Sequence, residues 1–263
     1  MAEITRDGVT LAYEEAGAGD PPIVFVPGGS CDSWSFHHQL DHFSAGHRCV
    51  ALDLRGHGRS DKPQQAYTMA GYADDVAWVI DRLGLDCPVV VGHSMGGAIA
   101  LQLAADHPEA VRAVVLDDPA PVTDNRAGFE QMLAAFARHG VDATRRRAFR
   151  NFFLEDFDEA LLDEVCDRAA ATPDHVFTSE IEGLRDWDGG AAARACRVPA
   201  LHIAAARPTC PPAVLAEAIP HVVTGQTVGA GHFNMLEVPD QVTAMIEQFL
   251  RRYVTPGQPS SGR

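Results

Sequence analysis

Short runs of apolar residues recur along the chain, separated by longer segments in which apolar residues return at helical spacing. An apolar run without alternation indicates a strand buried on both faces, and the amphipathic segments between such runs indicate helices that cover the sheet. The pattern predicts strands at 9–15, 23–26, 49–52, 88–92, 111–116, 200–204 and 222–228. It predicts helices at 70–83, 98–105 and 241–253. We therefore expect the α/β class, with a mostly parallel central sheet and helices on both faces.

The strand pattern stops after residue 120 and returns only after residue 195. The intervening stretch, 121–195, reads as helical throughout, with phenylalanine and other apolar side chains on the predicted inner faces. We expect it to form a helical cap, inserted between two parts of one core, 1–120 and 196–254. Residues 255–263 are rich in Pro, Gly and Ser and are predicted to form a flexible tail.

Composition narrows the choice of function. With 263 residues, 46% hydrophobic and 22% charged, the chain suits one large globular domain. A formal net charge of −15 disfavours nucleic acid and anionic membrane surfaces as partners. The apolar stretches fall short of the ~20 residues that cross a bilayer, and the first residues lack the pattern of a signal peptide. The six cysteines show no paired spacing, so we expect reduced thiols, a cytoplasmic location, and no metal or other cofactor.

One serine lies in a motif that is typical of a catalytic nucleophile. The segment Gly92-His93-Ser94-Met95-Gly96 has the pattern Gly-x-Ser-x-Gly and falls between a predicted buried strand and a predicted helix. In that context the serine occupies a sharp, strained turn, and the flanking glycines avoid a collision of Cβ atoms with the neighbouring strand and helix. The turn exposes the hydroxyl at a helix N-terminus, where developing negative charge is favoured. We predict that Ser94 is a nucleophile.

A nucleophilic serine needs a base. His232 follows a glycine-rich stretch between the last predicted strand and the closing helix, so it can fold back over the sheet edge. There its imidazole would accept the proton of Ser94. The other histidines of the motif regions, His57 and His93, are interpreted as structural.

These pieces together resemble the α/β-hydrolase family over nearly the whole chain. The resemblance rests on the segments 26–29, 53–60, 92–97 and 229–233. In that family the nucleophile, the acid and the histidine follow one another along the chain, an order that a serine at 94 and a histidine at 232 obey.

The resemblance also implies where the remaining groups of the site lie. The backbone N–H groups of Met95 and Gly29 are the expected donors to the oxyanion. Gly28 and Ser30, on either side of the second donor, are expected to contact the substrate. Trp187, where the cap rejoins the core, is expected to do the same.

The position of the acid departs from the family's usual pattern. That acid follows the strand after the cap, but residues 199–212 contain neither Asp nor Glu. The best-placed carboxylates are Asp117 and Asp118, at the end of the strand that follows the elbow helix. Because side chains alternate along a strand, the two are expected to point in opposite directions. We predict that Asp118, one step beyond the strand, orients His232, with Asp117 as the alternative.

A minority of the family shares this shifted acid. Zearalenone lactonases combine it with a serine nucleophile, and residues 204–209 are similar to their loop after the cap. Cofactor-independent dioxygenases that act on hydroxyquinolones share the shifted acid as well.

The sequence thus predicts a cofactor-free serine hydrolase that forms an acyl-enzyme on Ser94. The expected substrate is a carboxylic ester or lactone of a small to medium apolar or aromatic molecule, and the expected assembly is a monomer or homodimer. Three alternatives stay open: a dioxygenase that uses His232 and Asp118, a non-catalytic ligand receptor, and a hydrolase of carbon–carbon bonds.

Overall fold

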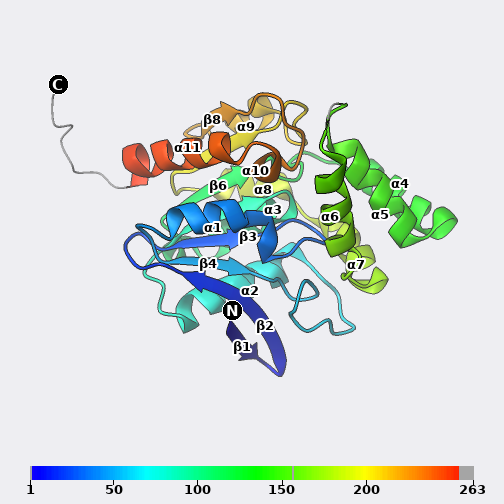
Figure 1. The fold of residues 1–263 in the computed structure, drawn as a ribbon, viewed down its shortest axis with the longest axis horizontal. Coiled ribbons are helices and arrows are strands. Elements are labelled where there is room, and N and C mark those ends of the chain that lie inside the picture. Colours follow the sequence, from blue (N-terminus) through cyan, green and yellow to red (C-terminus); the bar gives the residue numbers. More distant parts are fainter. Residues whose placement is uncertain (1, 156, 255–263) are drawn as a thin grey trace.

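The computed structural model, which describes residues 2–155 and 157–254, has an eight-stranded sheet with helices on both faces (Figure 1). The strand order is β1-β2-β4-β3-β5-β6-β7-β8. Pairing is antiparallel between β1 and β2 and between β2 and β4, and parallel from β4 to β8. This arrangement confirms the predicted fold class. The strands are β1 (Ala2–Arg6), β2 (Val9–Ala16), β3 (Ile23–Val26), β4 (Cys49–Leu52), β5 (Val89–His93), β6 (Ala113–Asp117), β7 (Ala200–Ala204) and β8 (Val223–Gln226).

The apolar runs predict seven of the eight strands that the structure describes, and three of them (β3, β4 and β7) with their observed bounds. The pattern misses β1. Its residues alternate between exposed and half-buried positions, because β1 is an edge strand that pairs only with β2. An edge strand without a buried residue leaves no apolar run in the sequence.

Helices cover both faces of the sheet. The side chains of α2 and α3 form one apolar cluster with the sheet, and those of α1 and α11 form another on the opposite face. Apart from the four helices described below, the helices are α1 (His37–Phe43), α2 (Met69–Arg82), α3 (Met95–Asp106), α8 (Gly189–Ala195), α9 (Pro212–Ala218), α10 (Asn234–Glu237) and α11 (Pro239–Phe249). Two 3-10 turns, η1 (Ser33–Phe36) and η2 (Pro108–Ala110), and a closing π-helical turn, η3 (Leu250–Val254), complete these elements.

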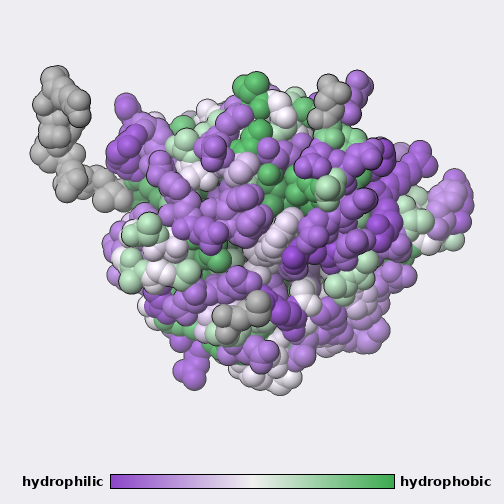
Figure 2. Space-filling model, viewed as in Figure 1, coloured by the Kyte–Doolittle hydropathy of each residue, from purple (hydrophilic) through white to green (hydrophobic). Residues whose placement is uncertain are grey.

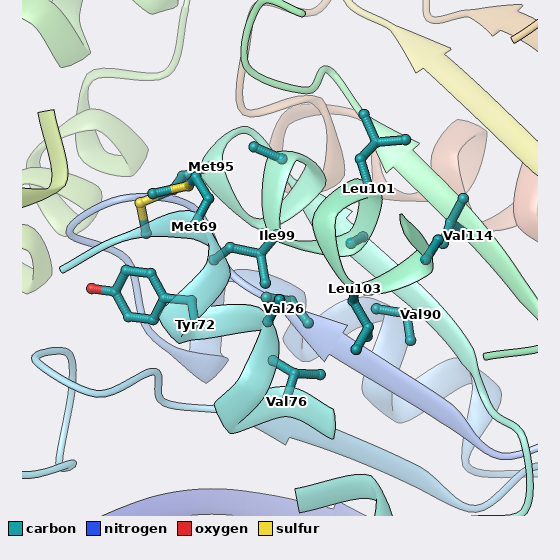
Figure 3. Packing of buried hydrophobic residues seen from close by; sticks show 14 of the residues in the cluster. Val26, Met69, Tyr72, Val76, Val90, Met95, Ile99, Leu101, Leu103 and Val114 are labelled. Carbon is teal, nitrogen blue, oxygen red and sulfur yellow. The ribbon is translucent and has the colours of Figure 1, made fainter. Parts of the chain in front are cut away.

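Nine of the twelve residues of helix α3 are buried. Ile99, Leu101 and Leu103 are fully buried, and Figure 3 shows α3 packed beside Val26 and Val90 of the sheet. The sheet lies beneath it, and α2 and α8 flank it. Because the sheet, α2 and α8 all pack against α3, its N-terminus is held at the end of β5, and this is where the predicted nucleophile lies.

Four helices stand apart from the core in Figure 1, on one side of the sheet. They are α4 (Arg126–His139), α5 (Val141–Phe152), α6 (Glu159–Ala169) and α7 (Asp174–Asp186), and we call them the lid. The predicted cap, 121–195, stays a prediction, and it includes α8 as well as the lid. Helix α8 packs against α3, with Ala192 and Ala193 buried in the core cluster, so the chain has rejoined the core before α8 begins. The predicted tail, 255–263, lies outside the described residues.

Hydrophilic side chains cover most of the face shown in Figure 2, in keeping with the net charge of −15. Within the described ranges, every helix is too short or too polar to cross a membrane.

Candidate active site

The turn between β5 and α3 has the strained geometry that its glycines predict. Ser94 lies at φ 53° and ψ −116°, a backbone conformation that residues other than glycine rarely adopt. A Cβ on Gly92 would lie 2.1 Å from the carbonyl oxygen of Gly96, and a Cβ on Gly96 would lie 2.1 Å from that of Val26. Both positions therefore require glycine. The Ser94 N–H donates to the carbonyl of Asp117 at 3.0 Å, which ties the turn to the neighbouring strand.

His232 and Asp118 form a buried pair. Nδ1 of His232 lies 2.5 Å from Oδ2 of Asp118, and the two side chains are 4% and 0% exposed. The other carboxylate oxygen of Asp118, Oδ1, accepts the backbone N–H groups of Ala205 and Thr209, each at 3.3 Å. The carboxylate thus has a fixed orientation, and it faces Nδ1 of the imidazole. This leaves Nε2 of His232 as the ring nitrogen free to exchange a proton with a neighbour.

The loop that carries His232 is held on both sides. The backbone N–H of His232 donates to the carbonyl of Phe152 at 2.8 Å. The centroid of the Phe152 ring lies 4.3 Å from the centroid of the His232 imidazole. Gly231 permits this approach, because a Cβ there would lie 2.1 Å from the same carbonyl. On the other side, Nε2 of His93 donates to the His232 carbonyl at 2.9 Å. Burial holds the pKa of His93 well below its usual range, so the ring stays neutral. His93 therefore has a structural part in the site.

Asp117, the alternative acid, lies elsewhere. It is the last residue of β6, aligned with His93 of β5, and it is fully buried. Burial and the neighbouring Asp118 carboxylate raise its pKa well above the usual range. A carboxyl group with a raised pKa holds its proton more readily than an ordinary one and is less suited to stabilise an imidazolium.

A cavity of about 260 Å³ lies between the sheet edge and the lid, and it brings the main candidates together. Ser94, His232, Met95 and Gly29 all line it, although they come from three separate parts of the chain. Within the described residues no hydrogen bond joins the side chains of Ser94 and His232. Such contacts are often long in the free state and tighten when substrate binds. The other lining residues are Ala120, Pro121, Asn125, Gly128, Phe129, Met132, Ala148, Phe149, Phe152, Phe177, Ile181, Leu184 and Thr209.

Three predicted substrate contacts lie outside this cavity. Trp187 borders a different depression, and its indole N–H donates to Gln102 of α3 at 2.8 Å. Gly28 lies under the elbow, where a Cβ would come within 3.2 Å of the Cβ of Ser94. Ser30 is 1% exposed, with its backbone N–H directed at His57. They do not line this cavity, and their contact with substrate stays a prediction.

Thr209 is a site residue that sequence reasoning missed. Its hydroxyl lies 3.1 Å from the carbonyl oxygen of Asp118 and 2.6 Å from that of Pro119. Together with its N–H bond to the Asp118 side chain, this fixes the loop on which the carboxylate sits. The signal in the sequence was present but indirect: the segment 204–209 stands where the family's usual acid would be.

A second missed feature is a buried pair beside the cavity. Nε2 of His57 lies 2.7 Å from Oε1 of Glu180 on lid helix α7, and both side chains are at most 1% exposed. Residue 180 lies in the middle of a predicted amphipathic helix, where a glutamate usually faces water, so the sequence offered no reason to select it.

Among residues 2–155 and 157–254, no group of three or more His, Cys, Asp or Glu side chains is arranged to hold a metal ion. The six cysteines, all within these ranges, are free thiols.

Comparison with known proteins identifies relatives of this chain. The family model described as "alpha/beta hydrolase fold" matches residues 21–173. The dihydrolipoyllysine-residue acetyltransferase component of the acetoin cleaving system of Cupriavidus necator is 30% identical over 265 aligned positions, which cover 93% of this chain and 67% of that protein. The chain spans about half the length of several other curated relatives that it matches.

Solved structures agree with this over nearly the full length. The enol-lactonase from Burkholderia xenovorans LB400 has a TM-score of 0.87 and 25% identity, covering 95% of this chain and 100% of that one. Est816, described as an N-acyl homoserine lactone degrading enzyme, has a TM-score of 0.82 and 26% identity, covering 94% and 100%.

Proposed function

The chain belongs to the α/β-hydrolase family, and from that premise we propose that it is a serine hydrolase that cleaves a carboxylic ester or lactone through an acyl-enzyme on Ser94. One observation carries the proposal. The buried Asp118–His232 pair borders the same cavity as Ser94. This arrangement supplies an activated nucleophile, a base and an orienting carboxylate.

In the first half of the reaction, Oγ of Ser94 attacks the carbonyl carbon and its proton passes to Nε2 of His232. Asp118 keeps the proton on Nδ1 and stabilises the imidazolium that forms. The N–H groups of Met95 and Gly29 hold the oxyanion. The tetrahedral intermediate then expels the alkoxide, which takes the proton from His232 and leaves as an alcohol. The acyl group remains on the serine.

In the second half, a water molecule attacks the acyl-enzyme while His232 accepts one of its protons. A second tetrahedral intermediate forms and collapses, and the proton returns to Oγ of Ser94. The carboxylic acid is released, and the enzyme regains its starting state. With a lactone, the alcohol and the acid are two ends of the same product molecule.

The cavity supports a neutral, apolar or aromatic substrate. Four phenylalanines line it, and the described lining contains no Asp, Glu, Lys or Arg. Its polar side chains, apart from Ser94 and His232, are Asn125 and Thr209. A carboxylate on the substrate would lose its hydration without gaining a charged partner, which is unfavourable. Two relatives of similar structure are described as an enol-lactonase and as an N-acyl homoserine lactone degrading enzyme, and this supports lactones as candidates alongside esters.

A fluorophosphonate probe tests the nucleophile. We expect mass spectrometry to find the covalent adduct on Ser94, and we expect Ser94→Ala to remove both the adduct and the hydrolysis of p-nitrophenyl esters. An unlabelled Ser94 in a protein that still hydrolyses esters would overturn the proposal. Oxygen uptake with a hydroxyquinolone, unchanged in Ser94→Ala, would instead favour the dioxygenase alternative.

A substrate series tests the cavity. The chain should hydrolyse p-nitrophenyl butyrate and phenylacetate at least about tenfold faster, in kcat/KM, than the mono-p-nitrophenyl ester of succinate, because burying one unpaired charge costs more than 1.4 kcal/mol. Equal rates with the anionic ester would contradict a preference for neutral substrates.

A further inference from the structure

Asp118 has an unusual backbone conformation. Its φ is 40°, in the left-handed region that residues other than glycine rarely occupy. Such a conformation is unfavourable and persists only where neighbouring groups hold it. Because Asp118 is completely buried, those groups belong to the protein itself. The orientation of the acid therefore depends on the residues that surround position 118.

One segment of the chain supplies the groups that hold Asp118. Residues 203–209, the end of β7 and the loop after it, contact both its backbone and its side chain. The N–H of Asp118 donates to the carbonyl of Ile203 at 2.8 Å. Its Oδ1 accepts the N–H groups of Ala205 and Thr209, each at 3.3 Å. A single loop thus fixes both the chain direction and the carboxylate plane at this residue.

Thr209 holds the acid from two sides. Its N–H donates to the carboxylate, and its hydroxyl lies 3.1 Å from the carbonyl oxygen of Asp118 and 2.6 Å from that of Pro119. A hydroxyl has one proton to donate, and the shorter distance favours the carbonyl of Pro119. Because threonine is branched at Cβ, its side chain has few rotamers, and the position of the hydroxyl is well defined. Thr209 therefore ties the side chain of Asp118, and the turn that follows it, to one loop.

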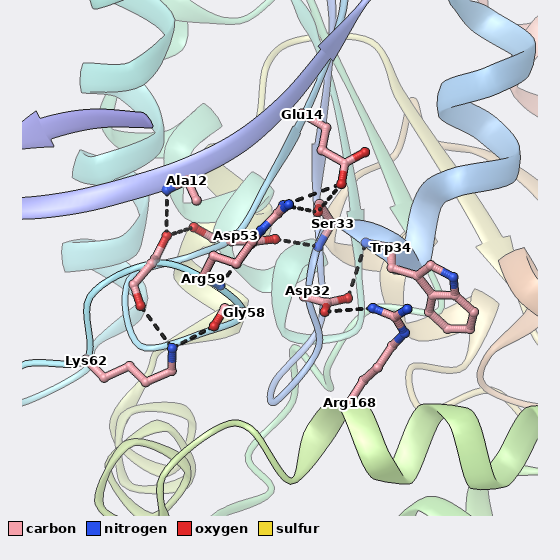
Figure 4. Close-up of polar contacts among 11 residues, drawn as sticks. Ala12, Glu14, Asp32, Ser33, Trp34, Asp53, Gly58, Arg59, Lys62 and Arg168 are labelled. Atoms are coloured by element: carbon pink, nitrogen blue, oxygen red, sulfur yellow. Dashed lines mark hydrogen bonds and ion pairs between the residues drawn. The ribbon is translucent and has the colours of Figure 1, made fainter. Parts of the chain in front are cut away.

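Asp53 is held differently, although it is also a buried carboxylate that accepts two backbone N–H groups (Figure 4). The N–H of Ser33 donates to one of its oxygens at 2.8 Å, and the N–H and Nε of Arg59 donate to the other at 3.0 and 2.8 Å. Both oxygens of Asp53 therefore have partners. At Asp118 the two N–H groups are directed at the same oxygen, Oδ1, so that Oδ2 faces Nδ1 of His232. The placement of the donors is what suits Asp118 to pair with a histidine.

The segment 203–209 stands where the usual acid of the family would be, and it contains no carboxylate of its own. We propose that Thr209 is a positioning residue: it holds Asp118 in its strained conformation with Oδ2 directed at His232, and so keeps the proton of the neutral imidazole on Nδ1. The inference rests on the proposed serine-hydrolase function. It adds that the loop at the place of the usual acid supports the shifted one.

The test compares two substitutions of Thr209. Thr209→Val removes the hydroxyl and keeps nearly the same shape, whereas Thr209→Ser keeps the hydroxyl and removes the methyl group. We expect Thr209→Val to lower kcat for p-nitrophenyl butyrate about tenfold, a part of the ~10⁴ that the wrong tautomer of the histidine costs. KM should change less than about threefold, because valine fills the same space in the cavity lining. Thr209→Ser should retain at least about a third of the original kcat, since it keeps the donor.

A double-mutant cycle separates positioning from general damage. In Asp118→Asn the histidine has already lost its acceptor, so a residue that acts through Asp118 has nothing left to position. We expect Thr209→Val to change kcat less than about twofold in that background, against about tenfold in the original chain. Equal losses in the two backgrounds would refute the positioning role.

Thr227→Val is the matched control. Thr227 is buried, and its hydroxyl lies 3.3 Å from the carbonyl of Ala204, at the end of β7. Among the described residues it makes no hydrogen bond with Asp118, so the change removes a buried hydroxyl from the same region and leaves the acid alone. It should keep kcat within about twofold of the original chain. A loss as large as that in Thr209→Val would overturn the proposal, because any missing hydroxyl beside β7 would then have the same effect.

Thermal unfolding shows whether each variant is folded. If Thr209→Val does not fold, Thr209→Cys takes its place, since a thiol is a weak donor of similar size. Its kcat should lie at least about threefold below that of Thr209→Ser, because a weaker donor holds the turn less well. Equal kcat in the cysteine and serine variants would contradict the proposal.

Failure of this inference and failure of the proposed function give different results. An original chain without esterase activity and without a Ser94 adduct removes both. An active chain in which Thr209→Val keeps the original kcat, or loses the same factor in the Asp118→Asn background, removes the positioning role alone.

Discussion

Replacement of Asp118 by asparagine gives a sharp test of the site, because the surroundings of this side chain dictate how an amide must sit. Two backbone N–H groups, from Ala205 and Thr209, donate to Oδ1 of Asp118. In Asp118→Asn the amide oxygen must occupy that position, since an NH₂ group there would face two donors. The NH₂ group is then left facing Nδ1 of His232, at the place of the oxygen that now lies 2.5 Å away.

A donor at this place changes the tautomer of the histidine. Nδ1 of His232 must accept the hydrogen bond from the amide, so the proton of the neutral ring moves to Nε2. A protonated Nε2 cannot take the proton of Ser94. The same substitution in serine proteases lowers kcat about 10⁴-fold, or roughly 5.5 kcal/mol, and we expect a loss of this order. Folding should survive, because the side chain keeps its shape and both backbone donors keep their acceptor.

The assay is the release of p-nitrophenol from a short ester, with thermal unfolding followed in parallel. Asp117→Asn is the matched control. Burial favours the neutral form of the Asp117 carboxyl and no hydrogen bond joins it to His232, so its amide should keep kcat within about threefold of the original chain. If Asp118→Asn retains more than about a tenth of the activity, or if Asp117→Asn costs as much, the assignment of the acid is wrong.

Four further outcomes follow from the structure. Asp117→Asn should raise the midpoint of thermal unfolding by at least about 2 °C at neutral pH. The pKa of Asp117 is raised in the folded protein, so this group lowers the stability of the original chain as pH rises above the ordinary carboxyl range. The stability gained in Asp117→Asn should therefore vanish when thermal unfolding is measured at progressively lower pH. Gly96→Ala should destabilise the fold by more than about 2 kcal/mol in urea titration, since its Cβ would lie 2.1 Å from a backbone oxygen of β3. Phe177→Ala should shift the kcat/KM preference toward longer acyl chains and cost about 3 kcal/mol of stability, because it enlarges the cavity at a buried site. Maleimide should label the half-buried Cys87 before Cys31, whose pKa burial raises to about 12; mass spectrometry at short times would show the opposite order if the packing is wrong.

The strands and the elbow could be predicted from the sequence because their causes are local. A strand buried on both faces needs consecutive apolar residues, and β3, β4 and β7 show them with the observed bounds. The elbow needs glycine at 92 and 96 because a Cβ at either position would lie 2.1 Å from a backbone carbonyl oxygen. Alternation along β6 predicts that Asp117 and Asp118 point in opposite directions, and the place of Asp118 one step beyond the strand favours it as the partner of His232, a contact that the structure has.

The tertiary structure alone decided which distant side chains meet. Asp118 and His232 are 114 residues apart, and their contact could be predicted only with the help of the family resemblance, since neither local sequence indicates that the two loops meet. Trp187 shows the converse. Its place near the cap boundary predicted a substrate contact, and nothing in the sequence indicated that its indole N–H donates to Gln102 of α3. Glu180 is an ordinary helix residue in the sequence, and it is a buried partner of His57 because of the position that α7 takes against the core. Backbone conformation depends on near neighbours in the chain, whereas the environment of a side chain depends on how whole elements pack.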